Sequence, residues 1–454
     1  MMGRRWISSQ VLKPILAAGG GVALLLLAAC GDEAAEEQGN AESNTVETQA
    51  VATLDPARAA AIQQGIEDFL VLVEGPLEQR IVHHGAVKVT AGSDAYDVTI
   101  EGVEIGVKGG DRMDVGTITY RLAPQGEDRY LASQLGHAPR LPVLDASGKE
   151  TGSLALKTKS FTGEWSNDLQ AFLALDWQVS DIVAADSEAS GGRFTASAMS
   201  SSLNSTDKGS GLYDQAGQFA LSGFSAREKA GGTLDIGRIS GSVAMTGVKL
   251  KDYMAKTREL QALMAELSDA GGSAGTAVTA TPPAGLEPAQ AQRLGEMIKG
   301  MSGLIAGTRY SVDVDTVTFK EPDSREAFRL QTGNLAVAFA GLDAEKATVT
   351  LGIGHDGLVV EDPELAQIPL FQKLLPARGN LALTLSEVPT RELWQLIGDQ
   401  FPMLVAGDQS QTEAAIGVMF IAMQQLLQEA PMKLSVDPSG LHAEILQADA
   451  SGAF

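Results

Sequence analysis

The sequence predicts an α+β fold, in which a mainly antiparallel, curved β-sheet carries amphipathic covering helices. Three observations predict it. Apolar residues recur at every second position in many short segments that end at glycine-containing turns, as in half-buried antiparallel strands. In a few longer segments the apolar residues recur at the period of a helix. A strand pattern also recurs along the chain, which would divide the sheet into two related halves.

The body of the chain opens with a helix that is expected to begin at Asp55 and Pro56. Aspartate caps helix N-termini, and proline fits the first helical position. Six apolar residues then fall on one face before Gly75: Ala59, Ile62, Ile66, Phe69, Leu70 and Val73. From Val87 the apolar period changes to two, and strands are expected at 87–89, 96–100, 103–107, 115–120, 152–159, 171–179, 193–199, 218–224 and 233–250.

The second half of the chain repeats this mixture of strands and helices. A helix is expected from Leu250 and another from Pro288, with strands, helices and a last hairpin after them. The strands are expected at 310–319, 328–339, 347–353, 357–360 and 379–386, the helices at 390–405 and 411–429, and the hairpin at 432–446, turning over 437–440. Residues 451–454 are typical of the start of a further strand. Because residues 269–285 are mostly small or proline, we expect a flexible linker there, between an N-terminal half (55–268) and a C-terminal half (286–454).

The recurring pattern is a strand that leads directly into an amphipathic helix. Residues 241–246 (GSVAMT) precede the helix expected around Tyr253, and residues 379–384 (GNLALT) precede the helix expected around Leu393. Residues 152–157 (GSLALK) repeat the strand without the helix. Either these are true repeats, or the pattern is simply that of a half-buried strand after a turn.

The first 29 residues have the features of a secretory signal. Basic residues at Arg4, Arg5 and Lys13 precede an apolar run that ends at Leu27. A membrane-spanning helix needs about 20 apolar residues, and this run is too short and is interrupted by glycines at 19–21. Residues 30–54 are acidic and poor in large apolar side chains, so we expect a flexible tether.

The end of this signal contains the only cysteine of the chain. Leu27, Ala28, Ala29 and Cys30 resemble the lipobox of bacterial lipoproteins. The resemblance implies cleavage before Cys30, lipidation of that residue with fatty acids such as palmitate, and a protein held on a membrane by its lipid. Gly31, and not aspartate, follows the cysteine, which in Gram-negative lipoproteins implies the outer membrane, with the body in the periplasm.

Charge and cysteine content exclude several classes of function. Removing residues 1–29 takes away three basic residues and no acidic one, so the net charge falls from −23 to −26. A chain this acidic is repelled by phosphates, which argues against nucleic acid as a partner. With its single cysteine expected to carry lipid, the chain has no structural disulfide or cysteine-based metal site.

The candidate chemical motifs are weak, and we predict no catalytic, cofactor-binding or metal-binding residue. Residues 271–275 (GGSAG) match the G-x-S-x-G pattern of serine hydrolases, but they lie in the linker and not between a strand and a helix. His83 and His84 are adjacent, and the other histidines (His137, His355 and His442) are isolated in turn-like settings, which favours surface histidines over a metal site. Asp313 and Asp315 should share one face of a strand, and such pairs usually belong to a solvated face.

Residues 230–454, with their Gly-x-Leu-x-Leu strands, a helical excursion and a closing strand, resemble uncharacterised proteobacterial envelope proteins and AsmA-type β-groove proteins. The resemblance implies a sheet that curls into a trough lined by aliphatic side chains. We therefore expect a non-enzymatic, lipid-anchored envelope protein that binds or shuttles a lipid or other apolar ligand. The alternative is a structural or protein-interaction lipoprotein that supports envelope assembly without a ligand cavity.

Overall fold

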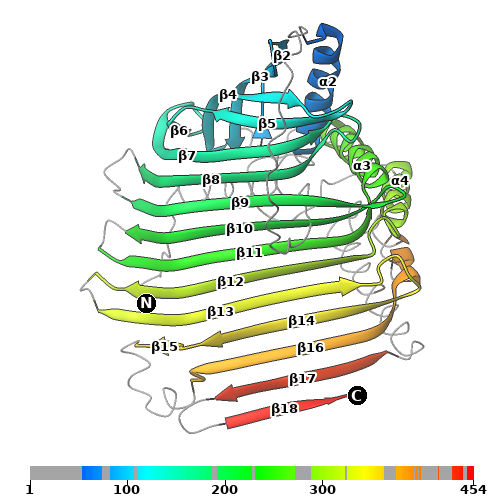
Figure 1. The fold of residues 1–454 in the computed structure, drawn as a ribbon. Coiled ribbons are helices and arrows are strands. Elements are labelled where there is room, and N and C mark those ends of the chain that lie inside the picture. Colours follow the sequence, from blue (N-terminus) through cyan, green and yellow to red (C-terminus); the bar gives the residue numbers. More distant parts are fainter. Residues whose placement is uncertain are drawn as a thin grey trace, which may run out of the picture.

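A computed structural model gives the fold. The structure describes residues 54–73, 82–106, 110–186, 192–227, 231–270, 288–322, 325–361, 375–392, 394–396, 398–399, 418, 432–442 and 447–453. Within these residues the strands form one antiparallel sheet that follows the order of the sequence, and helices accompany it (Figure 1). The predicted α+β class, mainly antiparallel and curved, is confirmed.

The first helix is α2 (Pro56–Val73), which starts where the sequence predicts. Asp55 caps it, because its Oδ1 accepts a hydrogen bond from the Ala57 amide at 2.9 Å. Phe69 packs edge-on against the buried Trp165, with ring centroids 5.6 Å apart. The other buried apolar residues of this helix are Ala59, Ile62, Ile66 and Leu70. The helix therefore encloses the N-terminal hydrophobic core.

The N-terminal part of the sheet contains short strands. They are β1 (Val82–His83), β2 (Val87–Ala91), β3 (Tyr96–Gly106), β4 (Arg112–Pro124), β5 (Arg129–Gly136) and β6 (Arg140–Leu144), followed by the longer β7 (Glu150–Ser166). Strands β5 and β6 each pair with both β4 and β7, so together they occupy one strand position. Figure 1 shows this part at one end of the sheet.

The remaining strands stack one beside the next (Figure 1). They are β8 (Ala171–Asp186), β9 (Arg193–Gly209), β10 (Leu212–Arg227), β11 (Thr233–Lys249), β12 (Gly307–Lys320), β13 (Glu326–Ala340), β14 (Lys346–Asp356), β15 (Val359–Val360), β16 (Arg378–Pro389), β17 (Lys433–His442) and β18 (Gln447–Ala453). β11 pairs directly with β12, so the sheet continues across the chain segment that separates the two predicted halves. The predicted linker at 269–285 lies outside the described residues from 271 onward.

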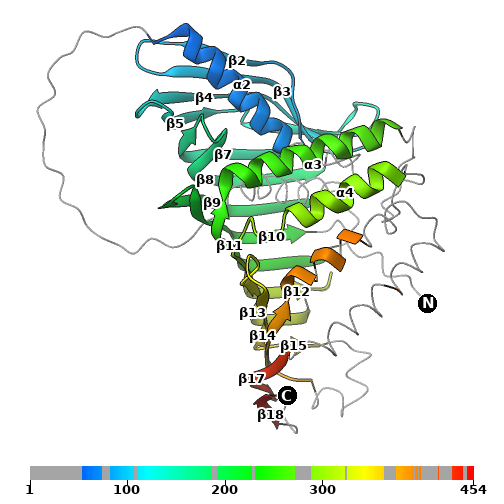
Figure 2. The same ribbon diagram turned by 90° about the vertical axis from the view of Figure 1, so that its right-hand side faces the viewer.

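Both predicted strand-to-helix transitions are confirmed. β11 leads into α3 (Leu250–Ala270), and β16 leads into helical residues that begin at Thr390. Each strand has a left-handed residue three positions before its helix, Gly247 (φ 61°) and Glu387 (φ 63°), followed by a buried valine. A second helix, α4 (Pro288–Gly300), packs beside α3. Figure 2 shows α2, α3 and α4 one after another along the sheet, whereas β13–β18 extend beyond α4.

A line of left-handed residues crosses the sheet and bends it; we call it the fold line. Its members are Asp181 (φ 56°), Gly223 (φ 61°), Thr316 (φ 55°) and Gly357 (φ 66°). The residue before each of them lies on one continuous cross-strand line, Ser180–Ala198–Ser222–Arg238–Asp315–Thr332–Asp356. A left-handed residue departs from the extended strand conformation, and the pairing register is the same on both sides of Asp181, Gly223 and Thr316, so these positions bend the strands without inserting a residue. Thr316 carries a branched Cβ, which makes this conformation costly and shows how strongly the bend is imposed.

The fold line also shifts the apolar alternation by one residue. Val179 and Ile182 lie three positions apart on either side of Asp181, and Leu221 and Phe224 lie three apart on either side of Gly223. All four apolar residues pack into the same core. The bend therefore keeps one face of the sheet apolar on both of its sides.

The predicted last hairpin is wrong. Residues 437–440 do not turn; they lie within β17, where the register with β16 shifts. Groups of β16 accommodate the irregularity, because Asn380 Nδ2 donates to the Pro438 carbonyl at 2.8 Å and the Ala382 amide donates to Ser439 Oγ at 2.9 Å. A proline in a strand is tolerated where such a bulge removes the need for its missing N–H.

Candidate functional site

The candidate site is a set of apolar side chains on one face of β12–β17, which we call the apolar face. It consists of four rows, a row being residues that lie directly opposite one another on neighbouring strands and so share a face. The rows are Thr308, Phe339, Val349, Leu385 and Leu434; Tyr310, Val337, Leu351, Leu383 and Val436; Val312, Leu335, Ile353 and Leu381; and Val314, Gly333, His355 and Gly379.

Many large side chains of the apolar face are open to solvent. Their exposed fractions run from 36% at Leu351 to 50% at Ile353. The others in this range are Tyr310, Val312, Leu335, Leu381 and Leu434. Isolated exposed apolar residues are ordinary in proteins, but contiguous rows of them mark a binding surface.

Near α3 the same face is buried on β11, although Phe219 of β10, in the row of Val312, is 36% exposed. Val243 of β11 is 7% exposed, whereas Tyr310, directly opposite it on β12, is 44% exposed. The first turns of α3 account for this change, because Leu250 and Met254 pack over Val243 in one buried cluster. The apolar face thus continues a hydrophobic core that α3 covers at β11.

The opposite face of the same strands is polar. In β12 it carries Arg309, Ser311, Asp313 and Asp315, which alternate with the apolar residues. Asp313 is exposed and Asp315 half-buried; they share one face, as predicted, and Arg238 of β11 lies opposite Asp315. One solvated face and one apolar face are what the alternation in the sequence predicts.

The arrangement can bind an apolar ligand by burial. Each Å² of apolar surface removed from water contributes roughly 25 cal/mol, so a ligand that covers several of these side chains gains affinity without specific polar contacts. In the described part of the chain, no three His, Cys, Asp or Glu residues are grouped so that they could hold a metal ion.

The five histidines lie in separate places. His83 is in β1, and the His84 ring bonds to the adjacent Gly85 carbonyl at 2.8 Å. His137 lies between β5 and β6, where its ring bonds to the Ala138 carbonyl and to Thr158 Oγ1 at 2.7 and 2.8 Å. The expectation of turn-like settings is wrong for His355 and His442, which lie in β14 and β17. Only His355 belongs to the apolar face.

Other predicted features lie outside the described residues. They are the signal and lipidation site at Cys30, the tether up to residue 53, the G-x-S-x-G pattern at 271–275 and, apart from Val418, the helix at 411–429. In the part of the chain that the structure describes, no helix is both long and apolar enough to cross a membrane.

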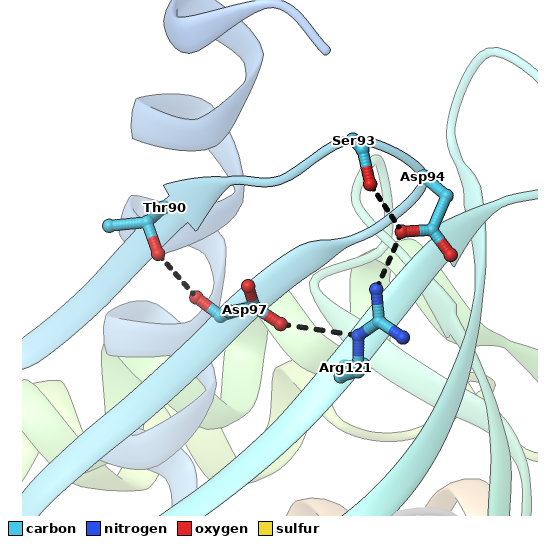
Figure 3. A network of polar contacts seen from close by, with 5 residues as sticks. All are labelled: Thr90, Ser93, Asp94, Asp97 and Arg121. Atoms are coloured by element: carbon cyan, nitrogen blue, oxygen red, sulfur yellow. Dashed lines mark hydrogen bonds and ion pairs between the residues drawn. The ribbon is translucent and has the colours of Figure 1, made fainter. Parts of the chain in front are cut away.

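A charged cluster at the N-terminal end of the sheet is structural and not catalytic (Figure 3). Arg121 of β4 donates to Asp94 in the β2–β3 turn at 2.7 Å and to Asp97 of β3 at 3.2 Å. Ser93 Oγ also donates to Asp94, at 3.1 Å. Both carboxylates are more than half exposed, so the cluster orders the turn at the surface and encloses no reactive group.

Arg121→Ala is expected to raise the pKa of Asp94. The hydrogen bonds from Arg121 and then Ser93 hold the pKa of Asp94 below its ordinary value of 3.8. These contacts therefore stabilise the fold above pH 3.8. Their stabilisation is lost as the pH falls through the lower pKa that Asp94 has in the folded state. A carboxyl NMR titration would measure the change. Asp145 is the internal control, because Ser147 and Lys149 lower its pKa, and an unchanged Asp94 value would contradict the assignment.

Comparison with family models, curated proteins and solved structures finds no match for this chain, so its function has to be inferred from the apolar face and the sequence motifs.

Proposed function

We propose that the chain is a lipid-anchored, non-enzymatic envelope protein that binds or shuttles a lipid or other apolar ligand on the apolar face. The observation that carries the proposal is the exposed aliphatic rows of β12–β17. A ligand that covered one of these half-exposed side chains would gain about 1 kcal/mol, roughly half of what full burial contributes. A face that only closed a core would be covered, as it is beside α3 on β11.

The chemistry of the face suits hydrocarbon chains. Its side chains are mainly leucine, valine and isoleucine, with Tyr310 and Phe339 as aromatic members. Branched aliphatic side chains pack against methylene groups by shape and burial, and they do not select a particular head group. Its lack of chemical selectivity fits a carrier of acyl chains better than a site for one small polar metabolite.

The ligand proposal is tested by mass spectrometry of organic extracts from the purified chain. We expect acyl lipids at a defined stoichiometry, and fewer of them from a variant whose apolar face carries a charge. An extract without lipid, together with a protein captured on this same face, would instead support the structural or protein-interaction lipoprotein.

The location follows from the resemblance of residues 27–30 to a lipobox. We propose lipidation of Cys30 and attachment to the outer membrane with the body in the periplasm, where the tether of 30–54 would let it stand off by roughly 25–30 Å as a flexible coil. Two or more acyl chains hold a protein stably on a bilayer, whereas one chain is marginal.

Cys30→Ser is expected to move the chain out of the membrane fraction. The measurement is sedimentation of membranes from cells that make each form, followed by detection of the chain in pellet and supernatant. Cys30 is the only cysteine, so the variant tests one thiol. Equal amounts of both forms in the pellet would contradict the anchoring proposal.

A further inference from the structure

His355 is the one side chain of the Asp, Glu, Lys, Arg and His types among the mainly aliphatic residues of the apolar face. Counting Asp, Glu, Lys, Arg and His over the four rows, all of which the structure describes, His355 is the sole member. It lies in β14 directly before Asp356, where the fold line crosses the strand. A polar group in such surroundings needs a reason, because burying it against hydrocarbon without a partner is unfavourable.

The residues beside the imidazole are small. Its neighbours across the strands are two glycines, Gly333 on β13 and Gly379 on β16. A Cβ added at Gly333 would meet Leu330 Cδ2 at 3.2 Å and no atom of His355 within 4 Å. In the next row all four residues carry branched side chains (Val312, Leu335, Ile353 and Leu381). The polar ring of His355 therefore lies in a row with smaller side chains than the aliphatic row next to it.

The hydrogen bonds of the ring are incomplete. Nδ1 of His355 is buried and has no hydrogen-bond partner. A buried N–H without an acceptor is rare in proteins, so we place the lone pair at Nδ1 and the proton at Nε2. Nε2 is then the ring atom that can donate a hydrogen bond to a ligand on the apolar face.

The apolar residues beyond His355 have the extent of a long acyl chain. On β14 the same face continues through Ile353, Leu351 and Val349, three steps of two residues, or about 20 Å. The next residue, Asp356, belongs to the row of Thr332 and Asp315 on the polar face, so the strip of the apolar face begins at His355. Along this face an imidazole is followed by aliphatic side chains, which suits a ligand with a polar group at one end of an acyl chain.

We propose that His355 Nε2–H donates a hydrogen bond to an oxygen of the lipid head group, and that the acyl chain lies along β14 from Ile353 to Val349. This inference rests on the proposed function and specifies its ligand as an acyl lipid with an acceptor oxygen at one end. A pure hydrocarbon would bind the same strip without using His355.

The test compares photoreactive palmitate with photoreactive hexadecane on the full chain in its membranes. Cross-linked peptides are mapped by mass spectrometry for the wild type, His355→Leu and the matched control Thr350→Val. Thr350 lies on the same strand as His355 but on the opposite, polar face. A hydrogen bond to a charged group contributes about 1.5–3 kcal/mol, so His355→Leu should lower palmitate labelling of β14 at least tenfold. Hexadecane labelling should change less than twofold, and Thr350→Val should change neither.

Two outcomes overturn the inference in distinguishable ways. If both probes label β12–β17 but His355→Leu affects them equally, or affects neither, the head-group role is wrong and the proposed function stands. If neither probe labels β12–β17 in the wild type, the proposed function fails and the role of His355 fails with it.

Discussion

Ile353→Asp is expected to fold as the wild type does and to bind apolar ligands at least 100-fold more weakly. Ile353 is half exposed in the free chain, so a charge there remains hydrated and should change the free energy of unfolding by no more than about 1 kcal/mol. A bound acyl chain would cover the carboxylate. Burying a polar group without a partner costs at least about 3 kcal/mol, which sets the expected loss of affinity.

Thr350→Asp is the matched control for this substitution. Thr350 lies in the same strand on the opposite, polar face, between Ala338 and Thr384. Thr350→Asp introduces the same charge three residues from Ile353 and should leave ligand binding unchanged. Affinity is measured by titration of a fluorescent fatty acid. Equal loss in both variants would show that charge, and not the covered face, is responsible; no loss in either would place the ligand elsewhere.

Trp165→Ala is expected to lower the free energy of unfolding by about 3 kcal/mol. Trp165 is fully buried and packs against Phe69 at 5.6 Å and Phe172 at 5.2 Å, so its truncation leaves a cavity between α2 and the sheet. Large aromatic truncations in cores cost about 3–5 kcal/mol. We expect the lower end, because the indole Nε1 has no hydrogen-bond partner and its removal relieves an unpaired donor.

Urea unfolding followed by circular dichroism measures this loss. Val71→Ala is the control, since Val71 is 49% exposed on the helix that carries Phe69 and should change stability by less than about 0.5 kcal/mol. If Trp165→Ala unfolded at the same urea concentration as the control, α2 would not be held to the sheet by this aromatic cluster.

Local signals in the sequence predicted most helices and strands. The cap at Asp55, the start of α3 at Leu250 and the long strands from β11 to β16 were all accessible from residue types and periodicity. The sequence could not distinguish a strand end from a bulge. Two strands were expected at 96–100 and 103–107, but β3 runs through both, because Gly102 takes a left-handed conformation (φ 60°) and the strand continues past it.

The candidate site was only partly accessible. Alternation identified which side chains share a face, but exposure depends on what packs above them. Val243 and Tyr310 occupy neighbouring positions in one row, and only the position of α3 explains why the first is buried and the second open. His355 was missed because it lies between Gly354 and Gly357, in a glycine-rich segment that favoured a turn. Its place between two glycines of other strands depends on register, which one sequence does not reveal.

The fold line has a consequence for how such a chain can change its length. Its left-handed residues lie at Asp181, Gly223 and Thr316, in β8, β10 and β12, and then at Gly357 directly after β14, so they recur on every second strand. A hairpin, and not a strand, is therefore the unit that evolution can duplicate or delete while the curvature is preserved. Each inserted pair would widen the aliphatic surface by about 10 Å across the strands, so related chains of different length should differ from this one by whole hairpins.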